Sequence, residues 1–192
     1  MSHDLQLPAD FKEALAGLRA APHRSELTLS EVPAPARLAP FRVALGAEVL
    51  VEGEELATGR FILLHDPDGS DLWGGTFRIV TYIRAQLEPD IGNDSLLGNV
   101  AWAWLVESLE EHRAQYSNAG GTATRILSES YGSLASRPDA IDIELRASWT
   151  PEGRDMSAHL DAWVDIVCTF AGLPPVPDGV TLLPQRRPRN NG

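Results

Sequence analysis

The sequence predicts one α+β domain, built on a twisted and mostly antiparallel sheet. Apolar and polar residues alternate in several segments, which is the period of a strand with one buried face. Other segments repeat apolar residues at helical spacing. The 192 residues sit at the upper end of one ordinary domain. We expect the order helix, three or four strands, helix, two strands, helix.

The segment Glu54–Glu88 is predicted to form a β-hairpin, around which the rest of the chain is arranged. Two alternating runs flank the turn-rich segment His65–Asp71, in which Pro67 and Gly69 supply the backbone angles that a reversal needs.

In the second run of this hairpin the two faces differ in polarity. We expect Phe77, Ile79 and Ile83 to be buried, with Arg78 and Arg84 on the opposite face. We interpret His65, at the shoulder of the hairpin, as a strand-end residue.

The segments before the hairpin follow from the same patterns. A helix is expected from Ala9, a short strand over Glu26–Glu31 and a longer strand over Val43–Val51. The prolines of Val32–Pro40 lack amide donors, so this segment is expected to cross between strands as an extended loop.

After Pro89 the period becomes helical. A helix is expected from Leu96 to Leu109, ending before Gly120-Gly121, and then strands over Thr122–Tyr131 and Ile141–Trp149. A last helix carries Leu160, Trp163, Val164 and Val167 on one stripe. We therefore expect a domain over residues 9–175, with flexible termini at 1–8 and 176–192.

The helix from Leu96 to Leu109 is apolar around much of its circumference. Trp102 and Val106 fall outside the stripe that carries Trp104. Such a helix is buried on more than one side, either by its own chain or by a second copy. Because two-fold dimers are the commonest assemblies, we expect a homodimer.

A weak internal repeat runs through the chain. Ile79, Arg84 and Pro89 match Ile141, Arg146 and Pro151 at one constant offset, and each strand precedes a tryptophan-bearing helix. Coincidence between two amphipathic strands explains this pattern as well as two units related by an internal two-fold.

Several motifs carry a family resemblance. They are HDPDG, W-x-GTFR-x-V-x-Y-x-RA-x-LEP, AGGT-x-TR, SESYG, RASWTP, HL-x-AW and AGLPP. Over roughly Leu18 to Val180 the chain resembles a bacterial family known as domain of unknown function 3000. This resemblance implies no activity, substrate or catalytic residue. Separately, the expected order of elements is similar to the type III secretion chaperone fold, by topology alone.

Composition and charge limit the classes of partner and the cellular compartment that we expect. The formal net charge of −11 repels phosphate backbones, so we expect no nucleic-acid partner. No apolar run approaches the length of a membrane span, and the start of the chain has no secretion signal. A single cysteine excludes an intramolecular disulfide. We expect a cytoplasmic protein without a membrane partner.

The sequence shows no catalytic motif, and we expect no cofactor and no metal. The acidic segment Asp66–Asp71 lacks the glycine position and the closing glutamate of a calcium loop, so a turn is the better interpretation. The five histidines have no ligand spacing. Cys168 is expected to be a small core residue rather than a nucleophile. An enzyme whose site is assembled from distant residues stays possible.

The candidate binding residues are Arg78, Tyr82, Arg84, Arg146 and Trp102. The first four lie on the polar faces of their strands, where they form either a solvated surface with cross-strand ion pairs or a groove for a peptide or small anion. Trp102 is either an interface residue or part of the core.

Two hypotheses of function follow from these residues. The first is a non-enzymatic interaction protein, an adaptor or chaperone-like module that binds another protein or a second copy of itself. The alternative is a small-ligand sensor or enzyme that uses the arginine-bearing sheet face.

Overall fold

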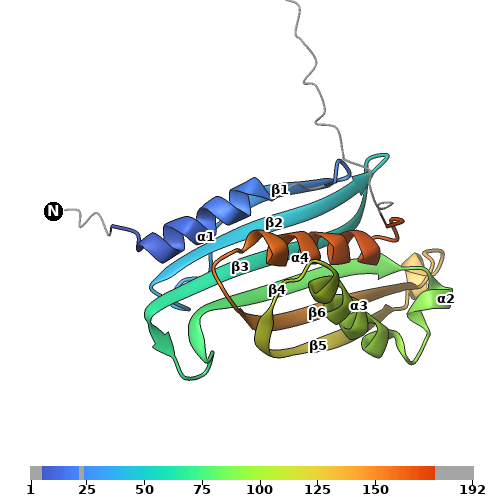
Figure 1. Cartoon of the computed structure of the whole chain (residues 1–192). Helices are drawn as coiled ribbons and strands as arrows, with labels where there is room; N and C mark the ends of the chain where they lie inside the picture. The colour runs from blue at the N-terminus through green and yellow to red at the C-terminus, as the bar shows by residue number, and fades with distance from the viewer. Residues whose placement is uncertain (1–5, 22–23, 176–192) are drawn as a thin grey trace, which may run out of the picture.

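The computed structural model describes residues 6–21 and 24–175, which form one open sheet with helices on one face (Figure 1). The strands are β1 (Leu27–Val32), β2 (Phe41–Val51), β3 (Glu54–Ser70), β4 (Gly75–Leu87), β5 (Tyr116–Ser128) and β6 (Ala140–Pro151). The helices are α1 (Ala9–Ala20), α2 (Pro89–Gly92), α3 (Leu97–Glu111) and α4 (Ser157–Phe170), with a 3-10 turn at Gly132–Leu134. The predicted flexible tail 176–192, and residues 1–5 of the predicted N-terminal one, lie outside the described residues.

The predicted fold class is confirmed. The six strands follow the order β1-β2-β3-β4-β6-β5, and every neighbouring pair is antiparallel. Four strands precede α3 and two follow it, within the expected order. The segment between β1 and β2 is a loop, as its prolines require.

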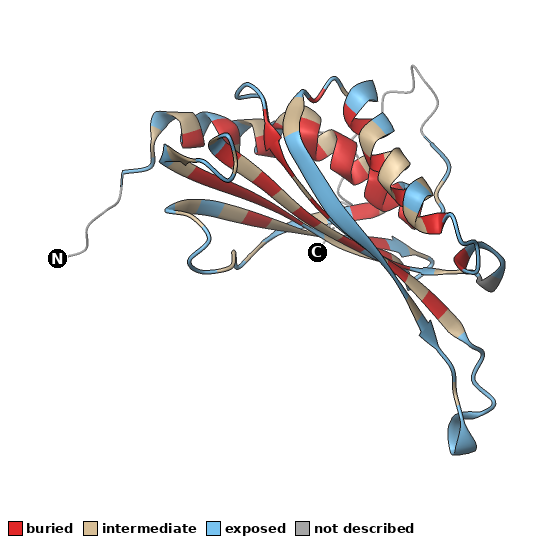
Figure 2. Cartoon of the chain, turned by 90° about the horizontal axis from the view of Figure 1, so that it is seen from below, coloured by how far each residue is buried: buried red, intermediate tan, exposed pale blue. Residues whose placement is uncertain are grey.

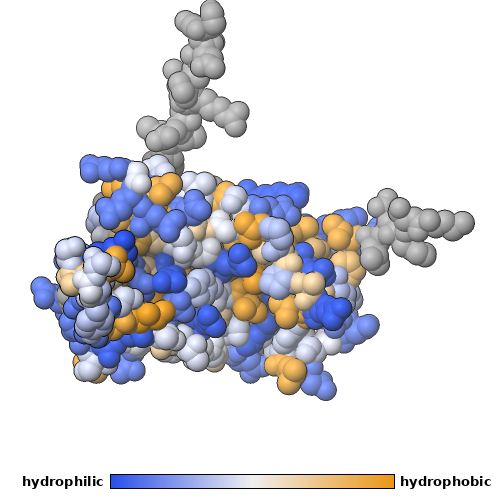
Figure 3. Space-filling view, turned by 180° about the vertical axis from the view of Figure 1, so that it is seen from behind, coloured by the Kyte–Doolittle hydropathy of each residue, from blue (hydrophilic) through white to orange (hydrophobic). Residues whose placement is uncertain are grey.

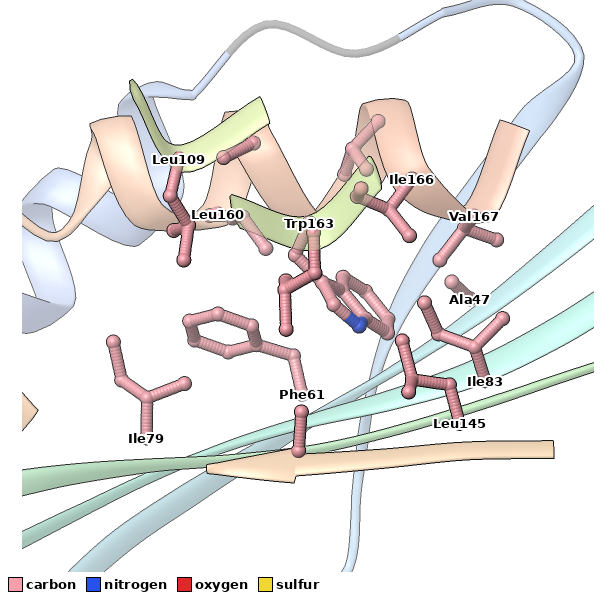
Figure 4. Packing of buried hydrophobic residues seen from close by; sticks show 14 of the residues in the cluster. Ala47, Phe61, Ile79, Ile83, Leu109, Leu145, Leu160, Trp163, Ile166 and Val167 are labelled. Atoms are coloured by element: carbon pink, nitrogen blue, oxygen red, sulfur yellow. The ribbon is translucent and has the colours of Figure 1, made fainter. Parts of the chain in front are cut away.

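The core lies between the sheet and α4. Trp163 is fully buried there, with its ring centroid 5.6 Å from that of Phe61. Ile79 and Ile83 of β4 and Leu160 of α4 surround the two rings (Figure 4). This dense apolar layer holds α4 across the middle of the sheet.

The predicted faces of the central hairpin are confirmed, but its turn is elsewhere. Phe77, Ile79 and Ile83 are buried, whereas Arg78 and Arg84 face away. β3 continues to Ser70, and the reversal occurs at Asp71–Gly74, where Gly74 has a φ of +67°. The ladder between β3 and β4 is interrupted from His65 to Ser70, so Pro67 lies where no ladder hydrogen bond is lost.

The interpretation of His65 as a strand-end residue was wrong. Its ring is buried and stacks on Phe77, with centroids 4.1 Å apart, and on Phe11 of α1 at 5.9 Å. Its Nδ1 lies 3.0 Å from the carbonyl oxygen of Thr76. The aromatic neighbours come from α1 and β4, which a local pattern around His65 does not reveal.

The predicted boundary at Gly120-Gly121 was also wrong, because both glycines lie inside β5. A β-carbon added to Gly121 would lie 2.9 Å from Cζ3 of Trp102 and 2.5 Å from the carbonyl oxygen of Arg146. The glycine therefore marks a close approach of α3 to the strand rather than a chain reversal.

The weak repeat has a counterpart in the structure. Ile83 and Leu145, which share the constant offset, lie opposite each other in the β4–β6 ladder, so an approximate two-fold passes between them. The helix of each unit packs on the first strand of the other, α3 on β5 and α4 on β3. Gly59 and Gly121 are separated by the same offset, and each lies under a helix tryptophan, Trp163 or Trp102.

Candidate functional site

The sheet face opposite the helices carries the predicted arginine residues. In the ladder Tyr82 of β4 lies opposite Arg146 of β6, and Arg84 lies opposite Glu144. Opposed residues of antiparallel strands point to the same face, so these side chains form one group. Polar residues spread across this face with apolar ones between them (Figure 3).

The arginines of this group are paired with carboxylates beside them. Nη2 of Arg84 lies 2.5 Å from Oδ2 of Asp142, and its Nη1 lies 3.8 Å from Oε1 of Glu144. Nη2 of Arg146 lies 3.7 Å from Oε2 of Glu144. The Arg84 and Arg146 side chains are 47% and 68% exposed, against 18% and 13% for Asp142 and Glu144. Exposed pairs of this kind contribute less than about 1 kcal/mol each. Their charges largely cancel, which favours a solvated face over an anion-binding groove.

Tyr82 joins the same group. Its hydroxyl donates to Oε1 of Glu144 at 3.0 Å, and the Arg146 guanidinium lies 5.5 Å from the centre of its ring. Burial, and then the hydrogen bond to Glu144, raise the pKa of Tyr82. The hydrogen bond to Asp142 raises the pKa of Arg84, so both groups keep one charge state over the physiological range.

Arg78 has a different environment from the other two arginines. Its guanidinium donates to the carbonyl oxygen of Asn118 at 2.8 Å, to Oγ1 of Thr150 at 2.9 Å and to Oγ of Ser148 at 2.8 Å. Burial lowers the pKa of Arg78. Arg78 therefore ties β4 to β5 and β6, and its donors are turned to the protein rather than to a ligand.

Sequence reasoning missed Arg60. This residue of β3 lies opposite Tyr82, on the side away from Arg146, and is exposed. Within residues 6–21 and 24–175 no hydrogen bond or ion pair involves its side chain. The alternation of β3 would have placed Arg60 on this face, had it been extended back from the hairpin.

Trp102 lies on the other side of the sheet from these arginines. It is half-buried on α3, over Gly121 of β5. Of the five predicted site residues, the structure brings together only Tyr82, Arg84 and Arg146. Arg78 links three strands by hydrogen bonds, and Trp102 lies at the border of the sheet.

The border strand β5 is the most exposed strand. Ten of its thirteen residues are exposed, and the other three are half-buried (Figure 2). It pairs only with β6, so its outer backbone edge has no strand partner among the described residues. It contains no carboxylate and one charged residue, Arg125, which donates to the carbonyl oxygens of Gly92 and Asp94. Such a strand edge is a template for pairing with another chain.

An apolar groove of about 530 Å³ lies at the opposite border, between α1 and β1–β2. Its lining is mostly apolar and includes Leu15, Leu18, Leu29, Val43 and Leu45. The charged residues of the lining are Arg19, Arg42 and Glu31. This lining suits an apolar segment better than a charged metabolite.

Among the residues that the structure describes, those that could act as a nucleophile or as metal ligands do not form a site. Burial raises the pKa of Cys168 to about 11, which disfavours the reactive thiolate. In the part of the chain that the structure describes, no three His, Cys, Asp or Glu residues are grouped so that they could hold a metal ion. None of its helices is long and apolar enough to cross a membrane.

A family model described as "Protein of unknown function (DUF3000)" matches residues 7–181. The chain belongs to the DUF3000 family. No curated protein and no solved structure matches the chain, so the likeness to the type III secretion chaperone fold is not confirmed. For this member of DUF3000, the β5 border and the open sheet face are the two candidate surfaces considered below.

Proposed function

We propose that the protein is a non-enzymatic protein-interaction module, adaptor-like or chaperone-like, that binds a polypeptide partner by strand addition along β5. The exposed thirteen-residue border strand carries this proposal. In strand addition, backbone hydrogen bonds provide affinity and side-chain contacts provide selectivity. Trp102 and Val106 of α3, both half-buried, lie on the helix that packs on β5 and add apolar contact area.

Natural proteins usually protect long border strands with charges, bulges or a covering element. β5 has one irregularity, between Ser117 and Gly120, and from Gly120 to Ser128 its ladder with β6 is regular. The uncovered length therefore supports a strand partner better than a purely structural role.

The test is affinity capture with the tagged full-length chain. Thr124→Lys places a charge in the middle of β5, whereas Thr28→Lys places the same charge on the opposite border strand, β1. Proteins bound to the wild type should be lost from Thr124→Lys and kept by Thr28→Lys. Equal capture by all three chains would contradict the proposal.

A second candidate function is the binding of a small anion on the open sheet face, and exposed Arg60 beside Tyr82 favours it. Inorganic phosphate or succinate at millimolar concentration should then raise the melting temperature of the wild type, but not that of Arg60→Ala/Arg146→Ala. Equal shifts for both proteins would argue against a site there.

We place the interaction in the cytoplasm. The single cysteine is buried, and a chain with one cysteine cannot form an intramolecular disulfide. The net charge of −11 supports a protein partner rather than a nucleic acid.

A further inference from the structure

The β5 border has features that suit pairing with an identical strand. The chain contains 27 acidic residues, yet none lies in β5. Its one cation, Arg125, already donates to the backbone carbonyls of Gly92, at the end of α2, and Asp94, between α2 and α3. Two copies can therefore meet along β5 without placing like charges directly opposite each other, although their net charges repel elsewhere.

Resting on the proposed strand addition, we propose that the occupant of the β5 edge is a second copy of this chain, paired antiparallel with β5 about a two-fold at Thr124. A two-fold perpendicular to the sheet keeps the helices of both copies on the same side. The two sheets then continue into one another across the β5–β5 pair.

The regular part of β5 indicates the register. The ladder with β6 is uninterrupted from Gly120 to Ser128, and Thr124 is its central residue. A two-fold there overlaps this whole segment with its mate and sets Thr124 opposite Thr124 of the second copy. Threonine pairs are favourable across antiparallel strands. Arg125 then faces Ala123 directly. The Arg125 residues of the two copies are diagonal neighbours, and each donates to backbone carbonyls of its own chain.

The same register accounts for two apolar side chains that the single chain leaves in contact with water. Leu127 is 57% exposed and lies opposite Gly121 of the second copy in this pairing. Gly121 is the residue that Trp102 overlies, so the leucine of one copy reaches the tryptophan of the other. Their contact removes apolar surface from water on both sides of the two-fold.

The first turn of α3 packs on β5 close to the proposed two-fold. A β-carbon added to Gly98 would lie 3.5 Å from Cβ of Ala123, so Gly98 is where α3 comes close to the strand near the two-fold. Because Gly98 has no side chain, α3 packs close to its own β5 there.

The decisive experiment uses charge complementation at Thr124, with molar mass measured by light scattering after size-exclusion chromatography. The wild type should be dimeric at tens of micromolar. Thr124→Lys and Thr124→Glu each place two like charges opposite each other across the two-fold. Each alone should weaken the dimer by roughly 100-fold or more. An equimolar mixture of the two variants should form a heterodimer again, because the opposed charges are then complementary.

Thr28→Lys on β1 is the matched control and should remain dimeric. Circular dichroism establishes that each variant is folded. Amide hydrogen exchange of the wild type gives an independent measurement: protection of residues 120–128 should rise with protein concentration, and that of β1 should not.

Three outcomes would overturn the second-copy inference. They are a wild type that is monomeric at 100 micromolar, a dimer that both Thr124 variants leave intact, and a mixture of variants that stays monomeric. If the wild type is monomeric but Thr124→Lys still loses a captured protein, strand addition at β5 stands and its occupant is another protein. If the wild type is monomeric and capture is also unchanged, both proposals fail.

Discussion

The units β3–β4–α3 and β5–β6–α4 have the same order of elements, but their helices differ in burial. α4 crosses the middle of the sheet, and nine of its fourteen residues are buried. α3 lies over the border strand, and five of its fifteen residues are buried. Each helix places a tryptophan over a strand glycine, Trp163 over Gly59 and Trp102 over Gly121. The comparison teaches that position in the sheet, more than local pattern, decides whether such a helix becomes core or surface.

The largest expected difference between the two units is in the stability effect of their tryptophans. Trp163→Ala removes a fully buried side chain and should lower the free energy of unfolding by about 3–5 kcal/mol. Trp102→Ala, at a half-buried site, should cost about 1–2 kcal/mol in the Thr124→Lys background, where association does not contribute. Urea denaturation measures both values.

Trp163→Phe is the control for lost volume, because Nε1 of Trp163 has no hydrogen-bond partner among the described residues. It should cost less than Trp163→Ala. Equal costs for Trp163→Ala and Trp102→Ala would end the distinction between a core helix and a border helix.

The next largest effect is expected from His159 of α4. Burial lowers the pKa of His159 from 6.5 to about 4, and its Nδ1 accepts a hydrogen bond from Nε1 of Trp149. Because the folded pKa lies below the unfolded one, this contribution to stability is fully present above about pH 6.5. It is lost as the pH falls towards 4, by an amount on the order of 3 kcal/mol.

Urea midpoints of the wild type between pH 7 and 4, compared with those of His159→Phe, measure this contribution. The variant lacks the titrating ring and should lose less stability over that interval. A parallel decline in both proteins would show that other groups control the acid sensitivity.

The smallest expected effect has the opposite sign and comes from His112, at the end of α3. Its Nε2 lies 2.6 Å from Asp165 of α4, and this hydrogen bond raises the pKa of His112 above 6.5. The stabilisation is therefore fully present below about pH 6.5 and is lost as the pH rises through the raised pKa. For a partly exposed pair it should stay below about 1 kcal/mol.

Histidine titration by NMR should show the His112 pKa above its ordinary value in the wild type and close to that value in Asp165→Asn. An unchanged His112 pKa in this variant would contradict the link between the two helices.

The fold class was predictable because the apolar periodicity is local. Phe77, Ile79 and Ile83 report the buried face of β4 by alternation alone, and the helical stripe around Trp163 does the same for α4. Local patterns failed at two places: they put the turn of the β3–β4 hairpin too early, and they predicted a boundary at Gly120-Gly121, inside β5. Pro67 and Gly121 belong to residue types that usually end a strand. Here Pro67 lies in an irregularity of the β3–β4 ladder, and Gly121 lies at a close contact with Trp102 of α3.

The candidate site was less predictable than the fold, since it depends on which strands become neighbours. Alternation placed Tyr82, Arg84 and Arg146 on polar faces, and the β4–β6 pairing then brought them together. Cross-strand ion pairs were one of the two predicted alternatives for this face, and Arg84 and Arg146 do pair with Asp142 and Glu144. The sequence did not show that Arg78 is held by Asn118 and Thr150. The exposure of β5 is a property of strand order, which a single sequence does not contain.

The short β1 strand limits how far any assembly of this sheet can grow. β1 has six residues, includes Glu31, and runs into the proline-containing loop 33–40, whereas β5 is more than twice as long. A chain that offered two good edges could add copies end to end and form open fibres. Only the β5 edge is suited to strand addition. A strand that pairs with β5 therefore occupies that edge, and the complex keeps a finite size.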